Sequence, residues 1–380
     1  MDNKKWVAIW GNSPTYISRG IAQYAKDVTI RVRVKAAFDF EKSRFHFSNF
    51  SGDEPVTISK ACVAASKDGT SIDANSNVAI TFDGNRDVVI PAGEEIVSDE
   101  VDFSLNKGED FCVSYYMREF TLISGGEYTM GPLTHVHYAI GDLTESAELP
   151  INITNSTGTP LFLNTIDGYC TSDKKAMVLF GDSITSQNWA EYLALRALDE
   201  FPNRSCIRKS KSGSRVLREY SCLPYIGYGQ KGAKRFISEC SVAGADSVLI
   251  LHGINDIIHP DGVNPFRPMC DLPTVDELID GFRYYIKCAR EMGLKVYVGT
   301  NLPIKGWRTY APFREELRVG LNEWIRTTDE IDGVVDFDAA LRDPDDISAM
   351  LPEYDSGDHL HPSYDGGKKM AYTVPSEFLR

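Results

Sequence analysis

The stretch Ala176-Met177-Val178-Leu179-Phe180-Gly181-Asp182-Ser183 decides the fold of the second half of this chain. Its apolar run is typical of a buried strand, and the Gly-Asp pair that follows is typical of the turn that ends one. Ser183 is therefore expected at the carboxyl end of a core strand. In open α/β sheets this edge is where ligands and catalytic groups collect, so Ser183 is a candidate nucleophile.

Beyond about residue 175, apolar runs alternate with amphipathic stretches, a pattern that indicates βαβ units and a parallel sheet. Strands are expected at 176–180, 247–251, 295–299 and 334–337. Helices are expected at 189–200, 231–241, 275–292, 313–327 and 367–378; the first of these follows Ser183 and is expected to begin near residue 187 or 188. We therefore predict a three-layer α/β/α domain over residues 176–380.

The first half has a different periodicity. Residues 28–34 alternate strictly between apolar and mostly basic side chains, which is typical of a half-buried antiparallel strand. Further strands are expected at 44–48, 56–65, 78–82, 88–90 and 111–116, separated by short Gly-, Pro- and Asp-containing turns. We predict an all-β sandwich, jelly-roll-like, over residues 1–165, and a polar linker over residues 166–175.

Composition excludes several function classes. The 380-residue chain carries a net charge of −14, which disfavours nucleic acid and anionic membrane surfaces as partners. No stretch approaches the roughly 20 apolar residues of a membrane span. The first residues lack the pattern of a secretory signal, so we expect a cytoplasmic protein. The cysteines are scattered without a C-x-x-C spacing, so reduced thiols are expected at Cys62, Cys112, Cys170, Cys206, Cys222, Cys240, Cys270 and Cys288.

A serine nucleophile needs a base, a group that orients the base, and donors for the developing oxyanion. Asp358 and His361 have a D-x-x-H spacing on a predicted tight loop, so the carboxylate can reach the imidazole. Asn255 follows the strand at 247–251 and is expected at the same sheet edge as Ser183. The loop Ser212-Gly213-Ser214 and the N–H of Ser183 supply candidate backbone donors.

Each of these motifs also has a structural interpretation, as a strand end, a helix cap or a surface turn. Four further residues are candidates for substrate binding: Asp182, His359, Trp189 and His135. Structural hydrogen bonds are the alternative for Asp182, and ordinary packing for Trp189. His135 and His137 share one face of a strand, but no third ligand is evident, so we predict no metal site and no cofactor.

The order of these motifs resembles the SGNH (GDSL) hydrolase superfamily. The resemblance rests on Gly181-Asp182-Ser183-Ile184, Gly213, Gly253-x-Asn255-Asp256 and Asp358-x-x-His361-Pro362, and spans residues 176 to about 375. It implies a flavodoxin-like sheet and ester hydrolysis through an acyl-enzyme without a metal. It assigns Ser183 as nucleophile and oxyanion donor, Gly213 and Asn255 as further donors, His361 as base and Asp358 as its partner. His359 stands where the superfamily often has glycine, which leaves open which histidine is the base.

The first half resembles the β-domain that precedes this fold in a two-domain bacterial branch of the superfamily. The matching positions are residues 6–11, 44–49 and 91–93. The resemblance implies a serine esterase acting on a small-molecule or oligosaccharide ester, most simply an O-acetyl group on a sugar. A lipid or thioester acylhydrolase is the alternative within this class. A carbohydrate-binding protein without catalysis is the alternative from another class.

Overall fold

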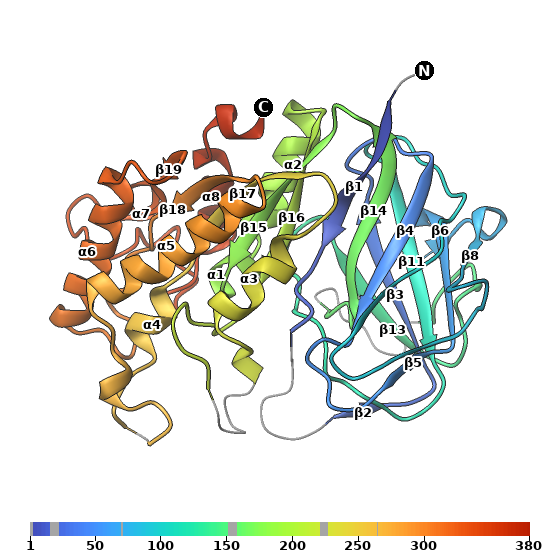
Figure 1. Cartoon of the computed structure of the whole chain (residues 1–380), viewed down its shortest axis with the longest axis horizontal. Helices are drawn as coiled ribbons and strands as arrows, with labels where there is room; N and C mark the ends of the chain where they lie inside the picture. Colours follow the sequence, from blue (N-terminus) through green and yellow to red (C-terminus); the bar gives the residue numbers. More distant parts are fainter. Residues whose placement is uncertain (1–2, 16–22, 70, 151–157, 221–226, 264) are drawn as a thin grey trace.

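The computed structural model describes residues 3–15, 23–69, 71–150, 158–220, 227–263 and 265–380. The first part of the chain consists of strands, and the second of a parallel sheet covered by helices (Figure 1). The two parts lie side by side and share a buried boundary. The predicted fold class, a β-rich part followed by an α/β part with a parallel sheet, is confirmed.

Two larger antiparallel sheets form the body of the first part, with strand orders β1-β14-β4-β10 and β13-β3-β11-β6-β7, and β8 paired to β6; β12-β2 and β5-β9 form two-stranded sheets beside them. Their core lies between the sheets, where the ring centroids of Phe47 and Tyr115 are 5.3 Å apart. The strands are β1 (Lys4–Gly11), β2 (Tyr24–Ala25), β3 (Val28–Lys35), β4 (Lys42–Ser48), β5 (Val56–Ile58), β6 (Lys60–Asp68), β7 (Ser71–Ile72), β8 (Val78–Ile80), β9 (Val88–Ile90), β10 (Glu95–Val97), β11 (Asp110–Met117), β12 (Thr121–Leu122), β13 (His135–Ile140) and β14 (Leu163–Thr171).

The predicted linker over residues 166–175 is wrong for most of its length. β14 lies between β1 and β4 and pairs with both, so only residues 172–174 connect it to the next strand. Asp167, one of the polar residues of this segment, is fully buried and accepts from Arg44 Nε at 2.7 Å and from His46 Nε2 at 2.9 Å. Charge pairing across the sheet therefore allows a polar sequence in a central strand.

All five strands of the second part are parallel, in the order β16-β15-β17-β18-β19. This is the flavodoxin-like order 2-1-3-4-5, in which the direction of winding reverses beside β15. Helices α2 and α8 pack together on one face of the sheet, and α3, α5 and α6 pack on the other (Figure 1). The elements are β15 (Lys175–Gly181), α1 (Ser183–Ser186), α2 (Trp189–Glu200), β16 (Arg204–Ser210), α3 (Gly232–Cys240), β17 (Ala245–Leu251), α4 (Ile254–Ile258), α5 (Val275–Glu291), β18 (Lys295–Gly299), α6 (Pro312–Thr327), β19 (Gly333–Val335), α7 (Phe337–Leu341) and α8 (Tyr364–Thr373).

Among the elements that differ from the sequence prediction, two belong to the parallel-sheet part and bear on the site. β16 was not predicted, because its sequence RSCIRKS has basic residues where an edge strand usually has apolar ones. Lys209 Nζ donates to Asn12 O of the first part at 2.9 Å, and Arg204 Nη2 donates to Asp246 Oδ2 of β17 at 3.2 Å. The last helix ends at Thr373 rather than at 378, since Val374 precedes Pro375 and is thereby kept out of helical geometry.

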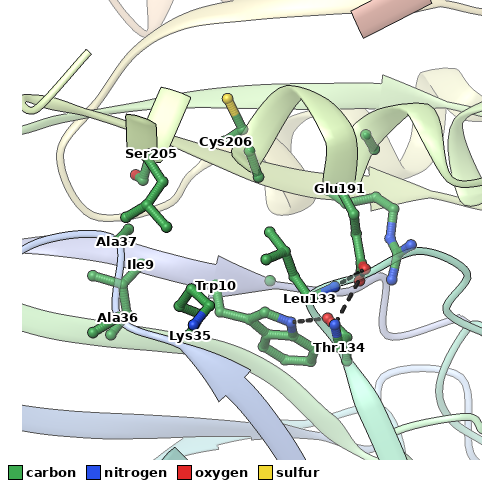
Figure 2. A pocket seen from close by; sticks show the side chains of 15 residues that line it. Ile9, Trp10, Lys35, Ala36, Ala37, Leu133, Thr134, Glu191, Ser205 and Cys206 are labelled. Atoms are coloured by element: carbon green, nitrogen blue, oxygen red, sulfur yellow. Dashed lines mark hydrogen bonds between the residues drawn. The ribbon is translucent and has the colours of Figure 1, made fainter. Parts of the chain in front are cut away.

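The boundary between the two parts is formed by β1 lying along β16. Ala8 O accepts from Ser205 Oγ at 2.7 Å, and Ala8 N donates to Ala243 O at 2.9 Å. Beside this seam lies a pocket whose wall includes Glu191 of α2, which accepts from the amides of Leu133 and Thr134 (Figure 2). Because β1 lies along β16, the edge strand of the parallel sheet is covered by the β-rich first part of the chain rather than exposed.

The seven cysteines within the described residues are free thiols, most of them buried, and Cys222 lies outside those residues. Packing as small apolar side chains, as expected for reduced cysteines, accounts for their positions. In the part of the chain that the structure describes, no helix has the length and apolar character needed to cross a lipid bilayer.

Candidate active site

Ser183 lies at the turn that joins β15 to α1. A Cβ on Gly181 would lie 2.3 Å from Leu251 O, so only glycine lets β15 approach β17 this closely. Asp182 caps the helix, because its Oδ1 accepts from Ile184 N at 3.0 Å. The short helix α1 thus begins at Ser183 itself and was not predicted, whereas the helix expected from residue 187 or 188 is α2, whose N-cap is Asn188. Since Ser183 is the first helical residue, its N–H has no acceptor within the helix.

Three side chains form a hydrogen-bonded chain at the carboxyl end of β15. His361 Nε2 lies 2.8 Å from Ser183 Oγ, and His361 Nδ1 lies 2.6 Å from Asp358 Oδ2. Asp358 Oδ1 also accepts from the amides of His361 and Leu360, at 2.8 and 3.0 Å. With Nδ1 donating to the carboxylate, Nε2 carries the lone pair that accepts the serine proton.

The charge of Asp358 is stabilised by its surroundings. Partial burial raises its pKa, but the hydrogen bonds from the side chain and backbone of His361 outweigh burial, and the net pKa lies well below the usual range. Asp358 is therefore ionised wherever His361 is neutral, which keeps the imidazole in the orientation that serves Ser183.

His359 forms a second Asp-His pair that does not include the serine. Its Nδ1 lies 2.6 Å from Asp355 Oδ2, and its side chain is half exposed. The backbone has a positive φ of 64°, in the region where the superfamily's glycine is unstrained, and the ring lies against Gly306. The structure therefore brings His361, and not His359, to Ser183.

The two other predicted oxyanion donors come from the loops after β16 and β17. Gly213 has a φ of +79°, and a Cβ there would lie 1.9 Å from Cδ1 of Tyr228, so glycine is required on both counts. Asn255 is the second residue of α4 and is buried; its Nδ2 donates to Ser214 O at 3.0 Å. An amide nitrogen has two hydrogens, so the second N–H of Asn255 is available to a ligand.

The segment after Gly213 is fixed by buried polar groups. Asp256 accepts from the amides of Val216 at 2.7 Å and Leu217 at 3.0 Å, and His252 Nε2 lies 3.0 Å from Ser214 Oγ. Burial raises the pKa of Asp256 to about 6 and lowers that of His252 to about 3. Both are thus structural residues that hold the loop carrying Gly213.

The remaining candidates for substrate binding do not line the serine. Trp189 is fully buried, with its ring centroid 5.4 Å from that of Phe337, so the prediction of a pocket residue is wrong and packing explains it. Asp182 is buried beneath the turn as a helix cap, and burial raises its pKa to about 7. His135 lies on β13 of the sandwich, opposite Arg33 of β3.

Several residues beside the site were not predicted. The ring of Trp307 lies edge-on to His361, with centroids 6.5 Å apart, and Gln187 Nε2 donates to Tyr128 OH at 3.4 Å. Tyr228 covers Gly213. These residues lie on loops without a motif, and only Ser124-Gly125-Gly126, which precedes Tyr128, carried a turn signal.

Within the described residues, no group of three or more His, Cys, Asp or Glu side chains is arranged to hold a metal ion. The arrangement that is present, a hydroxyl paired with an imidazole that is in turn paired with a carboxylate, is suited to nucleophilic attack on an acyl group.

Comparison with known proteins assigns the second part of the chain to a protein family. Residues 179–369 match the GDSL-like Lipase/Acylhydrolase family. Among solved structures, an acetylxylan esterase from Geobacillus stearothermophilus is 18% identical with a TM-score of 0.40, over 53% of this chain and 93% of that one. A GDSL-like lipase from Bacteroides thetaiotaomicron is 18% identical with a TM-score of 0.36, over 54% of this chain and 87% of that one. A search of curated proteins found no match.

Proposed function

Because the chain belongs to the GDSL-like Lipase/Acylhydrolase family and is a carboxylic ester hydrolase, we propose that it removes short acyl groups from carbohydrate through an acyl-enzyme on Ser183. The observation that carries the mechanism is the 2.8 Å contact of Ser183 Oγ with His361 Nε2, backed by Asp358 at 2.6 Å from Nδ1. A chain that had lost catalysis would have no reason to keep this alignment, so the binding-protein alternative is disfavoured.

In the proposed reaction, Ser183 Oγ attacks the ester carbonyl carbon while His361 Nε2 takes the hydroxyl proton. The tetrahedral intermediate collapses, the C–O bond to the alcohol breaks, and His361 returns the proton to the leaving oxygen. Water then attacks the acyl-enzyme, again giving a proton to His361, and the acid leaves as Ser183 Oγ regains its hydrogen. Asp358 stabilises the imidazolium in both halves and stays ionised.

Negative charge on the carbonyl oxygen is stabilised by three donors in this proposal. They are the N–H groups of Ser183 and Gly213 and the second N–H of Asn255. All three project from the turns after β15, β16 and β17, which meet at the same edge of the parallel sheet. Loss of one such donor costs about 10²–10³ in rate in other hydrolases.

The substrate class is supported by what borders the serine. Two partly buried rings, Trp307 and Tyr228, lie against His361 and Gly213, and the polar pair Gln187 and Tyr128 lies beside the turn that follows Ser183. Aromatic faces next to hydrogen-bonding groups suit a sugar, which presents both C–H faces and hydroxyls. A long acyl chain would instead require an apolar channel.

The mechanism is tested by hydrolysis of p-nitrophenyl acetate by the wild-type protein and by Ser183→Ala. We expect the variant to lose activity to background; equal rates above background would refute the esterase mechanism. The substrate class is tested separately, with acetylated oligosaccharides read by acetate release against p-nitrophenyl esters and acyl thioesters of increasing chain length. A preference for long chains would favour the lipid or thioester alternative.

A further inference from the structure

A carboxylate of the β-rich part reaches the loop that carries Gly213. Glu127 lies between β12 and β13, is 2% exposed, and accepts from Ser212 Oγ at 2.6 Å through Oε1. Its other oxygen, Oε2, accepts from Lys211 Nζ at 2.8 Å. Both partners belong to the second part of the chain, and both are buried, so this contact crosses the boundary between the two parts without exposure to solvent.

The backbone of Glu127 is itself held in place. Its carbonyl accepts from Asn12 Nδ2 at 2.7 Å, and the preceding Gly126 N donates to Thr15 O at 2.9 Å. Gly126 has a φ of +129°, and a Cβ there would lie 2.8 Å from Thr159 Cγ2, so glycine is needed for the approach. The carboxylate is therefore presented by a rigid turn rather than by a loose loop.

The partners of Glu127 are joined directly to two proposed oxyanion donors. Ser212 is bonded to Gly213, so the plane of their peptide sets the direction of the Gly213 N–H. Lys211 N donates to Gly181 O at 3.0 Å, which ties the same loop to the strand end that leads to Ser183. Fixing residues 211 and 212 from the β-rich part therefore fixes the spacing between the two donors.

We propose that Glu127 is a positioning residue of the esterase: it orients the Gly213 N–H through Ser212 and Lys211, so the β-rich part is required for full transition-state stabilisation. The inference rests on the proposed function, since it takes Gly213 as an oxyanion donor. It assigns the β-rich part a role in the chemical step, in addition to any contact with substrate.

The chain offers a matched pair of serines for the test. Ser212→Ala removes a hydroxyl that donates across the boundary at 2.6 Å, and Ser205→Ala removes one that donates across it to Ala8 O at 2.7 Å, on the opposite end of β16. Both serines are buried, so both variants lose a comparable buried hydrogen bond. Only Ser212 adjoins the loop with Gly213. Thermal unfolding, kcat and KM are measured for both with p-nitrophenyl acetate.

We expect Ser212→Ala to lower kcat about 10-fold to 100-fold with little change in KM, because a displaced donor costs less than one lost outright. Ser205→Ala is expected to keep kcat within about twofold, since it lies far from the reacting groups. Equal kcat values for the two serine variants at similar unfolding temperatures would overturn the proposal.

Two substitutions of Glu127 extend the test. Glu127→Gln keeps an acceptor for Ser212, whereas Glu127→Ala removes that acceptor together with the carboxylate that pairs with the buried Lys211 ammonium. We expect kcat to be highest in the wild type, lower in Glu127→Gln and lowest in Glu127→Ala. If Glu127→Ala does not fold, the comparison of Ser212→Ala with Ser205→Ala tests the proposal. Ser183→Ala separates the two claims: activity retained there refutes the esterase mechanism, while loss there with normal kcat in Ser212→Ala refutes only the role of Glu127.

Discussion

The two Asp-His pairs beside Ser183 allow a sharp test of which imidazole acts as base. Each histidine has its Nδ1 at 2.6 Å from a carboxylate, but only His361 has its Nε2 on the serine, at 2.8 Å. We therefore compare His361→Asn with His359→Asn. Asparagine suits position 359 because it tolerates the positive φ of 64° there.

The expected magnitudes follow from these contacts. Loss of a general base lowers kcat by about 10²–10⁴-fold, or about 2.7–5.4 kcal/mol in activation free energy, so His361→Asn should fall in or beyond this range. His359→Asn loses a half-exposed pair with Asp355, which is worth about 0–1 kcal/mol of stability, and asparagine relieves part of the strain of the positive φ. Its free energy of unfolding should change by about 1 kcal/mol or less, and its kcat only slightly.

The assay is steady-state hydrolysis of p-nitrophenyl acetate at pH 8, with urea unfolding of each variant as the control for folding. Comparable losses of kcat in the two variants, with both folded, would refute the assignment of His361 as the only base. A loss confined to His359→Asn would reverse it and would mean that the loop rearranges when substrate binds.

Two other substitutions test residues that shape the turns around Ser183 and Gly213. Gly213→Ala places a Cβ 1.9 Å from the Tyr228 ring and should lower kcat about 10²–10³-fold; an unchanged kcat would show that the Gly213 N–H is not a donor. Asp182→Asn should change the pH dependence of stability, because burial raises the pKa of Asp182 to about 7. The stability it contributes is present below about pH 4 and is lost as the pH rises through 7, so urea unfolding should show the variant gaining about 3 kcal/mol on wild type from pH 5 to pH 8. Parallel pH profiles would contradict that reasoning.

The candidate catalytic residues at strand ends could be predicted from sequence because two separate signals mark the end of each strand. The apolar runs before Ser183 and Asn255 set the strands, and the Gly-Asp and Gly-x-Asn turns mark where each strand stops. In a parallel sheet such ends share one edge, so proximity followed from topology. The choice between His359 and His361 did not follow, because each has an aspartate three or four residues before it, and only the path of the loop separates them.

The boundary between the two parts could not be predicted, because there the usual relation between polarity and exposure fails. β14 and β16 carry buried charged residues that pair with partners far away in sequence, such as Asp167 with Arg44 and Lys209 with Asn12. A pattern based on local hydrophobicity assigns such segments to linkers or leaves them out. Glu127 escaped notice for the same reason, since its partners lie 84 and 85 positions away.

The donors proposed for the oxyanion therefore differ in what supports them. The N–H of Ser183 is fixed by β15, by the cap from Asp182 and by the single turn of α1, all within residues 175–186. Asn255 is fixed by α4 and by its bond to Ser214 O. The N–H of Gly213 is positioned by two carboxylates. Asp256 holds the segment that follows Gly213, and Glu127 of the β-rich part holds Ser212, which precedes it. A shift of β1 relative to β16 would therefore displace the Gly213 N–H before it displaced Ser183, His361 or Asn255, and it would lower the activity through that donor.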